Sequence, residues 1–211
     1  MYVPKAFTVA DDEVRELLIQ HGAANLITQT ADGLLATLLP FVYDPETNVL
    51  RGHLARNNPQ WRAPALGESL AIISGPDAYI SPSAYASKRE HGRVVPTWNY
   101  VTAHVYGHLR IHDDPAWLAA LLRRLTDKHE AAFPEPWSID DTPEGFVAGQ
   151  LRAIVGVELT ITRVEAKAKL SQNRPAADID GVIESLTARG EFASAEAVRA
   201  ARPSTEPGPH S

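Results

Sequence analysis

The stretch GHLARNNPQW, residues 52–61, places a cation next to the start of a predicted helix. His53 and Arg56 precede Pro59, a residue common in the first turn of helices, and Asn58 stands where a cap is expected. Free backbone N–H groups at a helix start and a guanidinium fork suit a bound anion such as phosphate. The alternative is plain capping by Asn58 with Arg56 at the surface, and the residues alone leave both interpretations open.

Two further stretches, VPTWNY (residues 95–100) and KLSQNR (residues 169–174), are rich in planar side chains that form hydrogen bonds. Tryptophan and tyrosine beside asparagine and glutamine suit a flat heteroaromatic ligand, whose faces need apolar cover and whose edges need donors and acceptors. The alternative is a core tryptophan and a polar loop. The sequence has no G-x-G-x-x-G after a strand and no Walker A motif, so neither a Rossmann site nor a P-loop is indicated.

Two other groups of residues resemble sites without matching the required spacing. His104, His108 and His112 recur every four residues, but their β-branched and aromatic neighbours favour a strand, on which such histidines stand roughly 13 Å apart. No metal site is therefore expected. In ISPSAYASK, residues 80–88, the serines and Lys88 fit no nucleophile motif, which favours a loop broken by proline. A phosphate or ligand contact by Lys88 stays open.

The composition is that of an ordinary globular protein, with 44% hydrophobic and 22% charged residues in a chain of 211. The net charge of −6 provides no global field for nucleic acid, although a local basic patch is compatible with it. The chain has no cysteine, which excludes disulfides and thiolate chemistry. Because it shows neither a signal peptide nor an apolar run of about 18 residues, we expect a cytoplasmic protein with no membrane partner.

Periodicity and turn residues predict an α+β fold dominated by a barrel. A helix is expected from Asp11 to Gly22, and six or so strands with short turns between them favour a closed or half-closed antiparallel barrel with peripheral helices. The expected strands are 25–30, 34–43, 48–54, 69–74, 97–112 and 155–164, and the later helices begin near Pro115 and cover 142–153 and 179–201. We expect one domain over residues 1–202, ending in a C-terminal helical segment, and a disordered tail over 203–211.

Four segments, MYVPKAF, HLARNNPQW, ISPSAYASK…VPTWNY and KLSQNR, together resemble the PaiB-like family, the FMN-binding negative transcriptional regulators of bacteria. The resemblance runs from Met1 to about Arg202. It implies an FMN-binding split barrel of the flavin-reductase-like type, a split antiparallel β-barrel that forms a homodimer with FMN between the subunits. The family usually has an aromatic residue where Ala84 stands, which weakens the case for ring stacking by that loop.

The resemblance also implies which residues bind FMN. In split-barrel relatives the phosphate lies where the third strand gives way to a loop and helix. The implied phosphate ligands here are His53, Arg56, Asn57 and Gln60. Lys88 is a further cofactor-binding candidate, and the residues expected near the isoalloxazine ring are Trp98, Asn99, Lys169, Gln172 and Arg174.

The resemblance implies a repressor, yet direct DNA binding is not evident from the sequence. The predicted helix 116–129 carries Arg123, Arg124 and Lys128, but its apolar stripe is typical of a face committed to the core. Two interpretations stay open: regulation is indirect, or the family's name reflects a single member. DNA remains a possible partner that the net charge does not support. The alternatives are a flavin-dependent oxidoreductase and a haem-handling protein of the same superfamily. No paired carboxylates or cysteine supply catalysis, so any enzymatic activity would be the flavin's own, with His104 or Tyr106 as proton donors.

Overall fold

The computed structural model describes residues 1–143 and 145–203, and packing divides the chain into two compact units. Unit 1 consists of residues 1–9, 74–102 and 166 onward, and unit 2 of residues 10–73 and 103–165. The single domain expected over residues 1–202 stays a prediction. The predicted disordered tail lies, from residue 204 on, outside the described residues.

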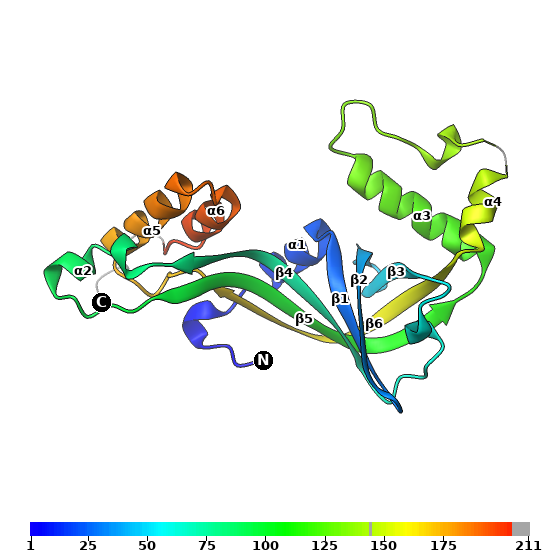
Figure 1. Cartoon of the computed structure of the whole chain (residues 1–211), viewed down its shortest axis with the longest axis horizontal. Coiled ribbons are helices and arrows are strands. Elements are labelled where there is room, and N and C mark those ends of the chain that lie inside the picture. Colours follow the sequence, from blue (N-terminus) through cyan, green and yellow to red (C-terminus); the bar gives the residue numbers. More distant parts are fainter. Residues whose placement is uncertain (144, 204–211) are drawn as a thin grey trace. The chain divides into compact units, whose positions relative to one another are not determined.

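Six antiparallel strands form a closed barrel in the order β1-β2-β3-β6-β5-β4 (Figure 1). Their bounds are Ala23–Thr30 (β1), Gly33–Asp44 (β2), Val49–Ala55 (β3), Ser69–Ile80 (β4), Thr97–His112 (β5) and Ile154–Lys169 (β6). Strands β4, β5 and β6 each contribute residues to both units. The expectation of an α+β fold built on an antiparallel barrel with peripheral helices is confirmed.

Helices precede the barrel strands, connect some of them and follow the last. They are Asp11–Gln20 (α1), Ser87–Glu90 (α2), Pro115–Glu130 (α3), Phe146–Leu151 (α4), Ala176–Ala188 (α5) and Phe192–Ala200 (α6). The 3₁₀ turns are Lys5–Phe7, Pro59–Trp61, Pro82–Ala84 and Ile139–Asp141. Within the residues that the structure describes, no helix combines the length and apolar character needed to cross a membrane.

The core of unit 2 follows the period-two alternation seen in the sequence. In β5, Ala103, Val105 and Gly107 are buried while the residues between them are partly exposed, as the alternation predicts. Helix α3 packs Leu121 and Leu125 onto the barrel strand β2. The ring of Trp117 in α3 packs directly on the backbone of Gly156. A Cβ at that position would lie 2.2 Å from the ring, so only glycine permits this contact.

Unit 1 has a core of its own, formed where α5 and α6 pack on the segments around Ile80 and Tyr85. A buried carboxylate, Asp178, accepts hydrogen bonds from the backbone N–H and the hydroxyl of Ser87, both at 2.9 Å, and so ties α5 to α2. The single helix expected over 179–201 is two helices. The chain turns at Gly190, whose φ of 77° is a left-handed conformation that glycine adopts without steric cost.

The structure also corrects two lengths and one element. Strand β4 continues to Ile80 rather than ending near residue 74, because Gly75 serves close approach to Val101 rather than a turn; a Cβ there would lie 2.9 Å from the Val101 Cβ. Strand β6 continues to Lys169 rather than ending at residue 164. The helix predicted after Asn58 is a three-residue 3₁₀ turn.

Candidate functional site

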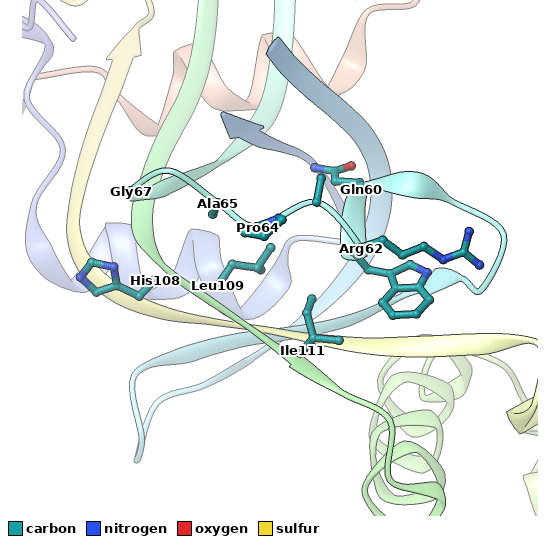
Figure 2. Close-up of a pocket in the computed structure, with 10 residues that line it drawn as sticks. Gln60, Arg62, Pro64, Ala65, Gly67, His108, Leu109 and Ile111 are labelled. Carbon is teal, nitrogen blue, oxygen red and sulfur yellow. The ribbon is translucent and has the colours of Figure 1, made fainter. Parts of the chain in front are cut away.

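A pocket of about 510 Å³ lies in unit 2, in front of strand β5 (Figure 2). One wall is the segment 60–67, which follows β3, and the other is formed by His108, Leu109 and Ile111 of β5. Ligand pockets typically enclose about 300 to 1,000 Å³, so this one is large enough for a flavin-sized molecule.

The walls of this pocket combine apolar surface with polar groups at the two ends. In Figure 2, Arg62 lies at one end, His108 and Gly67 lie at the other, and Leu109 and Ile111 lie between them. The guanidinium of Arg62 sits 5.0 Å from the centre of the Trp61 ring, and its Nη2 donates to the Arg56 carbonyl at 3.1 Å. Apolar faces with donors at the edges are what a planar, polar-rimmed ligand requires.

Gln60, predicted as a phosphate ligand, has its side-chain amide engaged within the barrel. Its Nε2 donates to the Leu26 carbonyl at 3.0 Å and to the Thr28 hydroxyl at 3.1 Å, and its Oε1 accepts from the Thr37 hydroxyl at 2.6 Å. The residue is only 1% exposed. Its polar atoms hold β1 and β2 together, and contact with phosphate, which stays a prediction, would require exchanging these bonds.

Arg56, the central residue of the predicted phosphate site, is also engaged. Its Nε donates to the Arg152 carbonyl at 2.7 Å, its Nη2 to the Ile154 carbonyl at 2.9 Å, and both terminal nitrogens donate to the Asp113 carboxylate. The hydrogen bonds with Asp113 raise the pKa of the guanidinium, and those from Arg56 lower the pKa of that carboxyl. The phosphate assignment of Arg56 stays a prediction that competes with this ion pair.

The remaining residues of that segment support the capping interpretation. Asn58 accepts a hydrogen bond from the Gln60 backbone N–H at 2.9 Å and so caps the turn. A turn of three residues sums too few peptide dipoles to attract an anion as a long helix does. Asn57 is exposed, and burial lowers the pKa of His53, which favours a neutral imidazole. Both stay predicted ligands without a shared recess.

Unit 1 holds a second, smaller recess of about 120 Å³. Three of the residues predicted near the isoalloxazine ring, Asn99, Lys169 and Arg174, line it together. Asn99 and Ser171 exchange hydrogen bonds in its wall, at 3.0 Å from Nδ2 to the hydroxyl and 3.2 Å from the hydroxyl to Oδ1. Sequence reasoning thus grouped residues that the fold brings to one place.

The other predicted residues of unit 1 stand outside this recess. Trp98 is half exposed, and its ring lies 6.2 Å from that of Tyr79. Gln172 closes its own loop, accepting from the Leu170 N–H at 2.7 Å and donating to the Ala168 carbonyl at 2.6 Å. Lys88 is exposed and donates to the Ser83 hydroxyl at 2.9 Å. Their roles toward a cofactor remain predictions.

Sequence reasoning missed several pocket residues. Trp61, Arg62 and His108 were not predicted as ligands, although Trp61 is the last residue of the stretch 52–61 in which the phosphate site was predicted. The criterion applied to residues 95–100 and 169–174, an aromatic ring beside planar polar groups, would have found Trp61 and Arg62. Nothing in the sequence indicates that His108 rather than His104 faces the pocket, because alternation places both on the same face of β5.

The closed antiparallel barrel places the protein in the class of split-barrel folds. Residues 1–163 match the family described as a putative FMN-binding domain. The chain is 35% identical to the protease synthase and sporulation protein PAI 2 of Bacillus subtilis, over 88% of this chain and 89% of that protein. It therefore belongs to the PaiB-like family, for which FMN is the cofactor, and the resemblance stated from the sequence is confirmed.

Other relatives and solved structures agree with this assignment. An uncharacterized protein of Emericella nidulans is 32% identical over 87% of this chain and 89% of its own. The flavocytochrome Anf3 from Azotobacter vinelandii has the same fold, with a TM-score of 0.59 and 15% identity over 79% of this chain and 72% of that chain. An FAD- and heme-binding protein from Mycobacterium smegmatis also has this fold, with a TM-score of 0.51 and 15% identity, over 78% of this chain and 74% of that chain. These solved structures confirm the split-barrel fold.

Replacing Gln60 with leucine should destabilise the FMN-free protein by about 2–4 kcal/mol, because the buried hydroxyls and carbonyls that it satisfies would lose their partner. Urea unfolding measures the change. Asn57→Ala, at the exposed neighbouring position, is the control and should stay within about 0.5 kcal/mol of the wild type. A Gln60→Leu protein of full stability that fails to bind FMN would show that Gln60 is a ligand instead.

Proposed function

We propose that the protein binds FMN in the pocket of unit 2 and acts in the cytoplasm as a homodimeric negative regulator of transcription. The observation that carries the proposal is a pocket of about 510 Å³ with apolar walls and polar ends, in a chain of the FMN-binding PaiB-like family. Trp61, Leu109 and Ile111 would cover the ring faces, and Arg62 and His108 would meet polar edges. Bound FMN would supply redox chemistry that no side chain offers.

Regulation by a route other than a DNA-reading helix is supported by the state of α3. Its Arg123 forms two hydrogen bonds of 2.7 Å with Asp140, and Arg124 contacts Asp44 at 3.1 Å. Lys128 donates to the His21 carbonyl. With its apolar face packed on the barrel and these three cations engaged, α3 is poorly suited to the major groove. A change of flavin state that alters binding to another macromolecule is a route that needs no such helix.

The homodimer is supported by an exposed pair of aromatic residues in unit 1. Tyr79 and Trp98 lie in ring contact at the surface, 43% and 50% exposed. Interface cores are enriched in these residue types, whereas an isolated surface seldom groups them.

The alternative function is a flavin-dependent oxidoreductase or a haem-handling protein. Its support is the position of His108 at one end of an open pocket, where an imidazole could move a proton to or from a bound substrate. His104 and Tyr106, the proton donors proposed from the sequence, instead stack edge to face with ring centres 6.5 Å apart.

Trp61→Ala should weaken FMN and riboflavin alike, by about tenfold, because the ring that it would cover is common to both ligands. Titration of flavin fluorescence quenching measures both affinities. Trp137→Ala is the matched control, since this residue of unit 2 is also partly exposed, at 47%, but does not line the pocket. Unchanged affinity in Trp61→Ala would place the flavin elsewhere.

FMN-loaded protein incubated anaerobically with NADH and with NADPH should keep its oxidised flavin spectrum, as expected of a regulator that does not turn over nicotinamide. The absorbance of the bound flavin, followed for several hours, is the measurement. Rapid bleaching by either nucleotide, lost in a His108→Gln protein that still binds FMN, would favour the oxidoreductase.

The wild-type protein should have twice the monomer mass of 23.0 kDa in light scattering at micromolar concentration. Trp98→Ala should shift the equilibrium toward the monomer by about tenfold or more, since central aromatic residues dominate interface energies. Phe192→Ala, which removes another exposed ring of unit 1, is the control. A wild-type monomer would refute the homodimer while leaving FMN binding untouched.

A further inference from the structure

The small recess in unit 1 carries two positive charges in its wall. Lys169 and Arg174 both line it and both are half-buried. Among residues 1–143 and 145–203, neither forms an ion pair with a carboxylate. A ligand of negative charge could accept hydrogen bonds from both cations.

Each cation is held in place by contacts that leave part of its donor set available. Lys169 donates to the Thr97 hydroxyl and, at 3.0 Å, to the Trp98 carbonyl, which accounts for two of the three hydrogens of its ammonium group. The guanidinium carbon of Arg174 lies 4.6 Å from the centre of the Tyr85 ring. A contact with one ring engages only part of a guanidinium, which has five N–H donors.

Tyr85 is a neutral member of the recess wall. Burial raises the pKa of its phenol, which therefore stays protonated and adds no negative charge. The residue is 2% exposed, and its hydroxyl is buried beside Ser171 and Arg174 without a hydrogen bond of good geometry. A buried hydroxyl in this state is unusual in folded proteins and often marks a site that is completed by a ligand or water.

The recess is also lined by neutral polar groups on a preformed backbone. Asn99 is 1% and Ser171 is 5% exposed, and they orient each other. Ser171 has a φ of 64°, a left-handed conformation that costs free energy in a residue with a side chain and is found preferentially at functional sites. The turn is closed by the Arg174 N–H, which donates to the Ser171 carbonyl at 2.9 Å.

We propose that this recess binds the oxyanion of a small ligand, a phosphate or carboxylate group, between Lys169 and Arg174. Its volume of about 120 Å³ equals that of about four water molecules, enough for such a group and too small for a three-ring flavin. Asn99, Lys169 and Arg174 are thereby reassigned from the isoalloxazine ring to an anion. The site does not depend on the proposed function, since its residues need no flavin to carry their charge.

Calorimetric titration of the full chain with sodium phosphate, with chloride holding the ionic strength constant, tests the proposal. Wild-type protein should show saturable binding, and Arg174→Gln and Lys169→Gln should each weaken it by about tenfold, the effect of losing one charge-assisted hydrogen bond. Arg199→Gln, which removes an exposed cation of α6 outside the recess, should leave binding unchanged. Thermal melts confirm that the variants fold.

A parallel measurement needs no substitution: the Nε–H resonance of Arg174 in the wild type should shift as phosphate is added. Repeating the titration with FMN-loaded protein identifies the source of the anion. Loss of phosphate binding would show that the phosphate of FMN occupies the recess, and would contradict the placement of FMN in the pocket of unit 2. Unchanged binding would assign the recess to a separate small anion. Both outcomes support an oxyanion site. No saturable binding by the wild type, or equal binding by both recess variants, would overturn it.

Discussion

The pocket of unit 2 depends on one buried amide. Gln60 joins the 3₁₀ turn after β3 to strands β1 and β2 through hydrogen bonds to Leu26, Thr28 and Thr37. Leaving this buried amide unpaired would cost several times the free energy that a surface hydrogen bond contributes. The hydrogen bonds of Gln60 therefore fix the position of the turn. The segment that follows it is thereby held in front of β5, and the pocket is the space left between them.

In unit 1, some polar residues near one short turn stabilise the structure and others are candidates for binding. The side-chain amide of Gln172 forms hydrogen bonds with the backbone of its own loop, and the hydrogen-bonded pair Asn99–Ser171 fixes the wall of the recess. Lys169 and Arg174 also line the recess. A turn that satisfies its own backbone needs little help from a ligand to hold its shape, which makes the recess preorganised and lowers the entropic cost of binding.

The fold was largely predictable from the sequence, because period-two alternation and turn residues act locally. The strand Thr97–His112 was predicted with its bounds, whereas the end of β4 was missed because Gly75, which permits close strand approach, has the same local signature as a turn. The residues of the recess were grouped by composition and by family resemblance. The partners of the phosphate candidates were not predictable: Asp113, which pairs with Arg56, stands 57 residues away.

This dependence on distant partners decides which cations can meet a ligand. The sequence alone does not distinguish Arg56 from Arg62. In the structure Arg56 donates to the Asp113 carboxylate and to two backbone carbonyls, whereas Arg62 lies on the Trp61 ring at the end of the pocket. The same reasoning applies to α3, where Arg123 is paired with Asp140. A sequence motif rich in basic residues therefore indicates an anion-binding site only where its cations are not already paired with carboxylates of the same chain. A cation that lines a recess and forms no ion pair within the described residues, as Lys169 does, is the stronger evidence for an anionic ligand.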